Sequence, residues 1–355
     1  MSIRIGNRSP CRCLFVPPHI LDHIAKVTAV SDAKPHPATL TAAASKQLRD
    51  QRRRAVVDLV ALTAAQEGQA RRVIFDCDRG VDFDAARKVR GEGDPPVGQP
   101  TSADAAYDSV GAVLDYYSKV LRRNSLDDLG MDIDAYVNYG ENFDNAFWDG
   151  SHIVLGTGDG EIFTDFSQSR EVMGHELAHG VVEHTANLEY NGQSGALNEH
   201  FADVFGSLAD QHSQGLTAQS ANWLIGDEIM APGLYGEALR SMAHPGTAYD
   251  NPLMGRDPQP AHMQDYYAGP LDNQGVHRNS GIPNRAFYLT AAEIGADEAG
   301  LIWFQGLLNL WPTATFPDAA TVISAQARIL VRDKVVTHRN GVQAVRSAFR
   351  AVGIL

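Results

Sequence analysis

The chain has 355 residues, of which 44% are hydrophobic, and a formal net charge of −13. This length allows about two domains, or one domain with a processed segment, around a sizeable core. So acidic a balance argues against nucleic acid and against an anionic membrane as the main partner.

The three cysteines are too few, and odd in number, for a disulfide framework. Cys11 and Cys13 are also too close in sequence for an unstrained mutual bridge, and the third cysteine is Cys77. We therefore expect a fold that does not depend on oxidation.

No apolar run approaches the roughly 18–20 residues that span a bilayer. The N-terminal apolar stretch Cys13-Leu14-Phe15-Val16 is shorter than the about 7–15 residues of a secretory signal. We expect no membrane partner and no recognisable signal peptide, which leaves localisation open between the cytoplasm and export by a non-classical route.

The chain divides into stretches of different pattern. Residues 1–40 are rich in Pro, His and Ala and show weak periodicity, whereas residues 41–70 combine a basic cluster with apolar residues at helical spacing. Strands are predicted at 73–75, 135–139, 145–148 and 152–155, with a helix at 105–121 between them. From residue 167 the pattern is mostly helical and ends in helices at 319–333 and 341–352.

The segment from Val172 to Gly180 carries the pattern His-Glu-x-x-His. Residues four apart lie on one face of a helix, so His175 and His179 can present ring nitrogens to one ion. Glu176 lies beside them. This pattern is typical of zinc peptidases, in which the glutamate acts on a metal-bound water.

A third metal ligand follows downstream at Glu199, at the start of a second apolar-periodic helix. Two histidines and one glutamate leave a fourth position open for water, which is typical of catalytic zinc sites. Asp203 lies one turn after Glu199 and can accept a hydrogen bond from a ligand histidine, most naturally His175. An ordinary surface carboxylate is the alternative interpretation of Asp203.

The stretch from His175 to Gly206 resembles the thermolysin family of metallopeptidases, and further motifs follow in the family's order. Asn145-Ala146-Phe147-Trp148 resembles the substrate-binding edge strand, and Arg240-Ser241-Met242 resembles the segment whose arginine contacts a substrate carbonyl. Asp272 to Gly281 resembles the segment that carries a catalytic histidine and its aspartate.

The resemblance covers roughly residues 71–355 and implies an α+β, two-lobed fold. A β-rich N-terminal lobe over 71–168 and a mostly α-helical C-terminal lobe over 169–355 would hold the zinc helix between them. The implied activity is a neutral endopeptidase that acts on peptides or proteins.

Each implied role falls on a residue of this chain. Glu176 activates the water, His277 and Tyr190 stabilise the oxyanion, and Asp272 orients His277. Asn145, Ala146 and Trp148 of the edge strand, together with Arg240, would bind an extended substrate. The implied pocket for a hydrophobic residue just after the scissile bond is lined by Phe163, Phe166, Val172, Ile225 and Leu239, each of which could equally belong to the core.

Structural calcium is also typical of the family. Glu171, Asp210 and Asp227 stand where acidic ligands are expected, whereas Asn222 and Leu224 replace two other carboxylates. Because calcium takes six to eight oxygen ligands, these replacements favour a weakened or single site over the full set. Three surface acids without an ion are the alternative.

Residues 1 to about 70 have no counterpart in the catalytic part, and the stretch from Val16 to Leu21 resembles the short propeptide of protealysin-type members. We expect an inhibitory, removable segment in the cleft, with its processing site in Arg49–Ala70 or at most up to Arg72. A zinc-capping thiolate from Cys11 or Cys13 is conceivable, but inert cysteines in a mobile tail are preferred.

Two other functions remain to be weighed. A related zinc aminopeptidase would need a Gly-x-Met-Glu-Asn motif before the zinc helix, and none occurs. A degenerate, non-catalytic relative would lack at least one catalytic residue, yet the full set is present.

Overall fold

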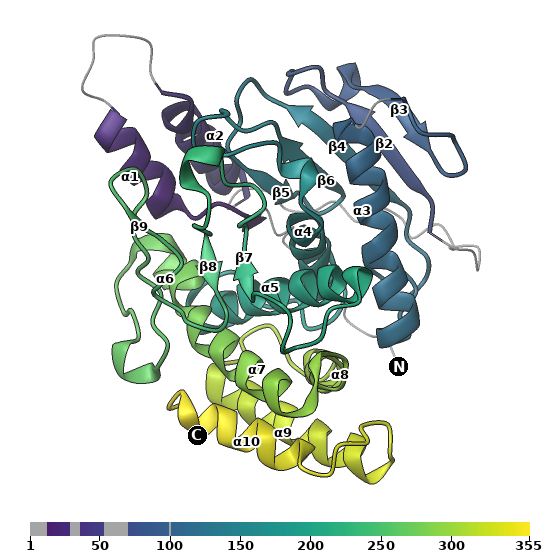
Figure 1. Ribbon diagram of the computed structural model, residues 1–355, viewed down its shortest axis with the longest axis vertical. Coiled ribbons are helices and arrows are strands. Elements are labelled where there is room, and N and C mark those ends of the chain that lie inside the picture. The colour runs from purple at the N-terminus through teal and green to yellow at the C-terminus, as the bar shows by residue number, and fades with distance from the viewer. Residues whose placement is uncertain (1–12, 29–35, 53–69, 99–100) are drawn as a thin grey trace.

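The computed structural model of the chain describes residues 13–28, 36–52, 70–98 and 101–355, and for 48–52 the backbone alone. Figure 1 shows a sheet in the upper part of the molecule and a group of helices below it, with α4 and α5 between the two. Among the described helices, none combines the length and apolar character that crossing a bilayer requires.

The upper part is built on a six-stranded mixed sheet in the order β1-β5-β6-β4-β2-β3. The parallel pairs are β2 with β4 and β4 with β6, and the other neighbours are antiparallel. In β4, Ile133, Ala135 and Val137 alternate with more polar residues and are buried, as a strand with one face on a core requires. The bounds are β1 Cys13–Leu14, β2 Arg72–Asp76, β3 Arg87–Gly91, β4 Ile133–Tyr139, β5 Ala146–Trp148 and β6 His152–Gly156.

Helix α3, Ser102–Tyr116, packs on this sheet and on α4. The Thr101 hydroxyl caps its first turn by accepting a hydrogen bond from Asp104 N. The helix continues as a π-helical turn, Tyr117–Leu121, and ends where Arg122 takes a left-handed conformation. The helix predicted at 105–121 is therefore present, in two forms.

The lower part contains seven helices and two small hairpins in the described residues. The helices are α4 Arg170–Glu183, α5 Gly192–Gln214, α6 Leu271–Asn279, α7 Gly281–Ile294, α8 Ala296–Leu307, α9 Phe316–Arg332 and α10 Gly341–Ala351. The hairpins pair β7 Leu224–Ile225 with β8 Arg240–Ser241, and β9 Asp250–Asn251 with β10 Gly255–Arg256. Short 3-10 turns lie at Phe83–Ala85, Phe166–Gln168, Pro232–Leu234 and Met263–Asp265.

The predicted helix at 319–333 begins earlier than expected, at Phe316. Thr315 and Asp318 form a reciprocal capping box, with a proline in the first turn. These terminal signals, and not the apolar period, set the start of α9.

In its described residues, the N-terminal segment adds strand β1 and helices α1 and α2; residues 1–40 had shown only weak periodicity. Helix α1, Pro18–Thr28, buries Ile20, Leu21 and Ile24, and α2 spans Pro37–Arg52. Figure 1 shows α1 beside β9, and His23 Nε2 lies 3.2 Å from the carbonyl oxygen of Pro252 in that hairpin. The helix predicted at 41–70 is described only as far as Arg52.

Candidate metal centre and active site

Helix α4 turns both histidines of the His-Glu-x-x-His pattern to one side. Ser169 caps the helix by accepting a hydrogen bond from Val172 N. The Nε2 atoms of His175 and His179 lie 3.0 Å apart, and both side chains are almost wholly buried. The four-residue spacing has therefore brought two potential ligand nitrogens together, as predicted.

Helix α5 supplies the third group. Glu199 Oε2 lies 3.6 Å from His175 Nε2, and Glu199 Oε1 lies 3.7 Å from His179 Nε2. Although burial alone would raise the pKa of Glu199, the surrounding His277, His179 and His175 hold it below its usual value. The three predicted ligands thus converge.

The donor set fits a zinc ion. His175 Nδ1 lies 2.9 Å from Asp203 Oδ1, and His179 Nδ1 lies 2.8 Å from Asn198 Oδ1. Each Nδ1 therefore carries a proton, and each Nε2 turns a lone pair toward Glu199. Glu199 Oε2 has no hydrogen-bond partner among the described residues. Two imidazole nitrogens and a carboxylate are ligands that zinc favours.

Asp203 is the centre of a buried ion pair behind the histidines. Arg240 Nη2 lies 2.8 Å from Asp203 Oδ1, and Arg240 Nε lies 3.0 Å from Asp203 Oδ2. Although burial would raise the pKa of Asp203, Arg240 and the hydrogen bond to His175 hold it well below its usual range. The surface-carboxylate interpretation of Asp203 is wrong, because its side chain is fully buried.

Cys13 does not lie in a tail. It is buried in β1 opposite Trp148, and its sulfur, a nitrogen of His179 and an oxygen of Glu199 lie within 4.8 Å of one another. Cys13 is disulfide-bonded, so its sulfur is not available as a thiolate ligand in this structure, whereas Cys77 is a buried free thiol. Cys11 lies outside the described residues.

Glu176 accepts a hydrogen bond from strand β5 of the sheet. The Trp148 backbone N–H donates to Glu176 Oε2 at 2.8 Å. The indole of Trp148 turns the other way, donates to Glu183 and packs beside Gly180 of α4. The predicted contact of Trp148 with the site therefore runs through its backbone and not through its side chain.

Helix α6 brings His277 to the opposite side of the metal position. His277 Nδ1 lies 2.6 Å from Asp272 Oδ1, and His277 Nε2 lies 3.6 Å from Glu199 Oε2. Tyr190 donates its hydroxyl to Glu199 Oε1 and lies 3.2 Å from His277 Nε2. Burial would lower the pKa of His277, but Glu199 and Asp272 raise it, so the imidazole is well placed to donate a hydrogen bond.

An unusual backbone places Asp272 against His277. Asp272, Asn273, Gln274 and Gly275 all have positive φ angles, between 47° and 82°. This left-handed run folds the chain so that Asp272 accepts from both the backbone N–H and the ring of His277, five residues on. Three of the four residues are not glycine, and such a conformation is costly for them.

Strand β5 and the residue before it carry predicted peptide-binding groups, and the chain's own β1 pairs with β5 as the outermost strand of the sheet. Asn145 Oδ1 accepts from Val16 N at 2.8 Å, and Ala146 O accepts from Phe15 N at 3.1 Å. Arg240 Nη1 donates to Phe15 O at 3.2 Å. The predicted substrate-binding residues are thus brought together around a segment that precedes the catalytic part.

The five predicted pocket residues are all buried and belong to the same apolar cluster as Phe15. A Cβ atom on Gly226, next to Ile225, would lie 3.1 Å from Leu239 Cδ1 and 3.2 Å from Phe15 Cε1. Phe163 and Phe166 pack on each other with ring centroids 5.8 Å apart. The Phe15 ring therefore fills space beside this wall.

The three predicted calcium ligands surround a hollow of about 190 Å³, together with Glu228, which the sequence had not singled out. Burial and the neighbouring Asp227 and Glu228 raise the pKa of Glu171 well above its usual value. Asp210 already pairs with Arg170 at 3.2 Å. The acids are therefore close together, and one of them has a protein cation as partner.

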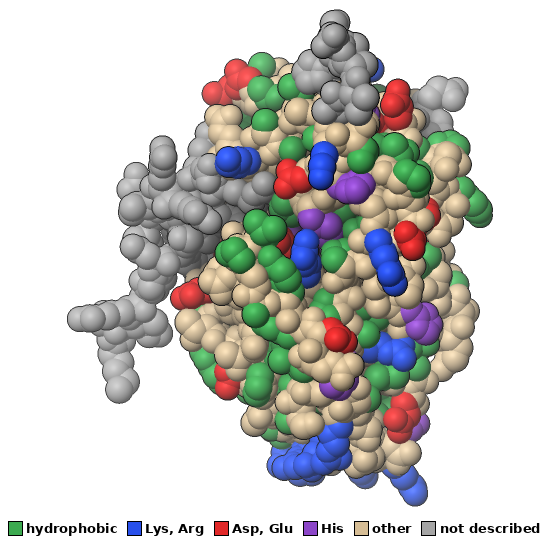
Figure 2. All heavy atoms as spheres, turned by 90° about the vertical axis from the view of Figure 1, so that its left-hand side faces the viewer, with side chains coloured by type: hydrophobic (Ala, Val, Ile, Leu, Met, Phe, Trp, Pro, Cys, Tyr) green, Lys and Arg blue, Asp and Glu red, His purple; other side chains and the backbone are tan. Residues whose placement is uncertain are grey.

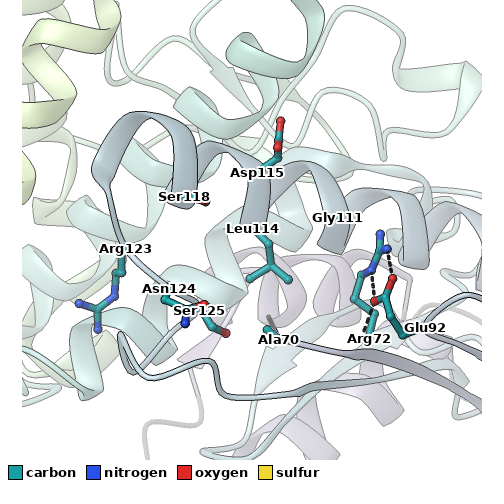
Figure 3. A pocket seen from close by; sticks show the side chains of 10 residues that line it. All are labelled: Ala70, Arg72, Glu92, Gly111, Leu114, Asp115, Ser118, Arg123, Asn124 and Ser125. Carbon is teal, nitrogen blue, oxygen red and sulfur yellow. Dashed lines mark hydrogen bonds and ion pairs between the residues drawn. The ribbon is translucent and has the colours of Figure 1, made fainter. Parts of the chain in front are cut away.

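A larger hollow, of about 330 Å³, lies away from the metal position. Figure 3 shows its wall, where Arg72 and Glu92 pair on one side and the π-helical end of α3 forms the other.

On the side of the molecule where α1 lies, Figure 2 shows acidic, basic and histidine side chains interspersed with hydrophobic ones.

Sequence reasoning missed several buried groups that hold the site. Asn198 fixes His179, and its only signal was its position beside Glu199. Asn284 Nδ2 donates to Asp203 Oδ2 at 2.9 Å, and Asn284 Oδ1 lies 2.7 Å from His200 Nδ1. Burial lowers the pKa of His200 to about 4, so this histidine is neutral.

Comparison with known proteins places the chain. A family model described as thermolysin metallopeptidase, catalytic domain, matches residues 29–183, and one described as thermolysin metallopeptidase, alpha-helical domain, matches residues 186–354. An extracellular metalloprotease of Pectobacterium carotovorum subsp. carotovorum is 48% identical over 245 residues, which are 68% of this chain and 70% of that protein. Protease PrtS of Photorhabdus sp. strain Az29 is 41% identical over 335 residues, or 90% and 88% of the two chains.

The precursor of protealysin, a metalloproteinase from Serratia proteamaculans, has a similar structure, with a TM-score of 0.82 and 38% identity. The match covers 97% of this chain and 100% of that one. The predicted two-lobed fold and the predicted metalloprotease class, a hydrolase, are thereby confirmed. The chain belongs to the thermolysin family of metallopeptidases, and within it resembles the protealysin-type members.

Proposed function

We propose that the chain is a zinc-dependent neutral endopeptidase that cleaves on the N-terminal side of hydrophobic residues and is made as a precursor. The observation that carries the metal assignment is the pair of Nε2 atoms, 3.0 Å apart, that face the Glu199 carboxylate. The catalytic lobes would be residues 71–168 and 169–355, and residues 1 to about 70 would be an inhibitory propeptide.

His175, His179 and Glu199 would hold the zinc ion. When bound, zinc supplies Lewis acidity, which makes a water easier to deprotonate and polarises a peptide carbonyl. Glu176 accepts the proton of the attacking water and returns it to the leaving amine. The hydrogen bond from Trp148 N holds one oxygen of this carboxylate in place.

The charge that develops on the carbonyl oxygen needs donors in addition to the metal. His277 Nε2 and the Tyr190 hydroxyl, 3.2 Å apart, both border the position of that oxygen. Asp272 orients the imidazole through its 2.6 Å contact with Nδ1 and favours its charged form.

A substrate would bind as an added strand on β5. Asn145 and Ala146 O would accept hydrogen bonds from its backbone, and Arg240 would donate a hydrogen bond to one of its carbonyl oxygens. The apolar wall formed by Phe163, Phe166, Val172, Ile225 and Leu239 favours a hydrophobic side chain after the scissile bond. The N-terminal segment uses the same groups through Phe15 and Val16, which supports its role as an inhibitor.

A structural calcium ion is proposed for the acidic hollow of Glu171, Asp210, Asp227 and Glu228. Its support is the buried Glu171 Oε1, which has no hydrogen-bond partner in the described part of the chain. Millimolar calcium should raise the melting temperature of the zinc-loaded protein by a few degrees, as for a ligand that binds only the folded state. An unchanged melting temperature would favour a cluster of acids that holds no ion.

The decisive test of the catalytic assignment is Glu176→Gln. We expect hydrolysis of an N-terminally blocked peptide with an internal hydrophobic residue to fall by on the order of 10²–10⁴. Zinc content should stay at one ion per chain, because Glu176 is not a ligand. Glu161→Gln is the control, since the Glu161 side chain is 79% exposed. Undiminished hydrolysis by the Glu176 variant would refute the role.

A further inference from the structure

The strand β1 lies on the edge of the sheet in a defined register. Cys13 is opposite Trp148 and Leu14 is opposite Phe147, in antiparallel pairing. The pairing continues one residue further, where Phe15 N donates to Ala146 O at 3.1 Å. This register fixes which peptide bond of the segment lies at the metal position.

The carbonyl at that position belongs to Leu14. Its oxygen lies 3.1 Å from His277 Nε2, the nitrogen that also lies 3.6 Å from Glu199 Oε2. A donor proposed to stabilise an oxyanion is therefore already in contact with the Leu14 carbonyl oxygen. The bond that follows this carbonyl joins Leu14 to Phe15.

Phe15 is held in the manner expected of the residue after a scissile bond. Its side chain is fully buried beside Leu239, and its ring meets the His175 ring edge to face at 5.0 Å. Its carbonyl accepts from Arg240, and the next N–H, of Val16, donates to Asn145 Oδ1. A hydrophobic residue thus occupies the position for which the apolar wall is selective.

We propose that the Leu14–Phe15 peptide bond is itself a substrate, and that the chain cuts it in cis within its own N-terminal segment. The proposal rests on the proposed endopeptidase function. One water adds across the bond: its oxygen joins the Leu14 carbonyl carbon, the C–N bond breaks, and a proton passes to the Phe15 nitrogen. The products carry a carboxylate on Leu14 and an amine on Phe15.

This cut would weaken the inhibition from inside the cleft. Before it, β1 is tethered on its C-terminal side to Phe15 and to α1, so it rebinds at a high effective concentration. After it, Cys13 and Leu14 still pair with β5, but no peptide bond joins them to Phe15 and α1. The segment would therefore act as a slow substrate that leaves the metal position once it has been cut.

The test follows the full chain by intact mass. The protein is purified in a zinc chelator, the chelator is exchanged for Zn²⁺, and samples are taken over time. We expect a fragment of residues 1–14 and a chain beginning at Phe15 to appear before any chain that begins near residue 70. Because the cut is in cis, its rate constant should not change on tenfold dilution. The Glu176→Gln chain should stay whole.

Variants of Phe15 separate this inference from a general loss of packing. Phe15→Asp should slow the cut about tenfold or more, whereas Phe15→Leu should keep it within a few-fold, since the pocket selects for apolar side chains. Val27→Asp is the matched control, because it puts the same charge on an exposed position of α1 and should leave the rate unchanged.

The outcomes distinguish this inference from the proposed function. At the end of the incubation, the same sample receives a blocked peptide substrate. Chelator-sensitive hydrolysis of that peptide, with residues 1–14 still joined to Phe15, overturns the inference and leaves the function standing. An apparent first-order rate constant that rises with protein concentration overturns the cis step. Absence of chain cleavage overturns the inference. Peptide hydrolysis that stays absent after the N-terminal segment has been removed with trypsin overturns the function as well.

Discussion

His175 and His179 each turn one ring nitrogen toward the candidate metal position and the other toward a buried acceptor. Asp203 accepts the hydrogen bond from His175, and it also accepts hydrogen bonds from Arg240 and Asn284. Such outer contacts fix the tautomer and raise the basicity of a ligand histidine. The strength of metal binding should therefore depend on residues that never touch the ion.

Replacing Asp203 with Asn tests this dependence. The amide can still accept from His175, but it leaves the buried Arg240 guanidinium without its closest charge partner. We expect zinc affinity to fall about 10–100-fold, in line with other losses behind metal ligands. Titration against a competing chelator, in the Glu176→Gln background to prevent self-cleavage, measures it. Asp297→Asn, at an exposed position of α8, is the control, and equal affinity in both variants would contradict the prediction.

For single residues, the sequence predicted the site wherever the functional residues stand at a fixed spacing along the chain. His175, Glu176 and His179 are readable because the helix period alone puts them on one face. Asn284 and His200 were not readable, because a buried asparagine and a neutral histidine look like any others until α5, α7 and α8 pack together. Trp303 Nε1 completes that contact by donating to His200 Nε2 at 2.8 Å.

Helices α4 and α5 approach closely because glycine faces glycine. A Cβ atom on Gly174 would lie 2.8 Å from the Cα atom of Gly206. One on Gly206 would lie 2.8 Å from both Glu171 O and His175 N. This contact brings Glu199 of α5 within reach of the histidines of α4, so the ligand geometry depends on the absence of two side chains.

The change Gly206→Ala sets two effects against each other. Helix propensity alone would favour alanine by about 1 kcal/mol. The new methyl group would meet backbone atoms that cannot rotate away, and overpacking of this kind costs about 1–3 kcal/mol. We expect a net loss of stability in denaturant unfolding, together with weaker zinc binding. Gly233→Ala, whose Cβ would meet nothing within 4 Å, should do neither. A more stable Gly206→Ala protein would show that the helices can separate without cost.

Sequence periodicity predicted elements of the catalytic part, both long and short, and the elements that it missed depend on contacts with other parts of the chain. Helix α1 buries Ile20, Leu21 and Ile24 in the same apolar cluster as residues of the catalytic part. The left-handed run from Asp272 to Gly275 has no sequence signal beyond its glycine, because three of its residues adopt that conformation under tertiary constraint. The two-residue strand β1 exists only through its pairing with β5.

At the scale of the whole molecule, the N-terminal segment contacts the catalytic part through buried polar groups. Asp144, next to the peptide-binding Asn145, lies at this contact, and its N–H donates to the Thr41 hydroxyl of α2 at 3.1 Å. Its own carboxylate accepts from Asp159 N at 2.8 Å. Burial, with the nearby Asp159 charge, raises the pKa of Asp144 to about 8.

That raised pKa makes the stability of the whole chain depend on pH. The unfolded chain releases the Asp144 proton near its usual value of 3.8, whereas the folded chain holds it until about pH 8. The contribution of Asp144 to the free energy of unfolding is therefore largest below about pH 4. It falls as the pH rises toward 8, by at most about 1.4 kcal/mol per pH unit. Above pH 8 both states are ionised, and the loss is constant.

Asp144→Asn replaces the titratable carboxyl group with a neutral amide, whose oxygen can still accept a hydrogen bond from Asp159 N. The stability gained by this variant over the parent should therefore grow between pH 5 and pH 8, by roughly 1–4 kcal/mol. Urea unfolding at the two pH values, with Glu176→Gln in both proteins, measures the change. Asp108→Asn, at a side chain that is 70% exposed, should show a difference that does not vary with pH. A gain for Asp144→Asn that is the same at both pH values would mean that the Asp144 carboxyl ionises in the folded chain as it does in the unfolded one, with its negative charge tolerated between the N-terminal segment and the catalytic lobes.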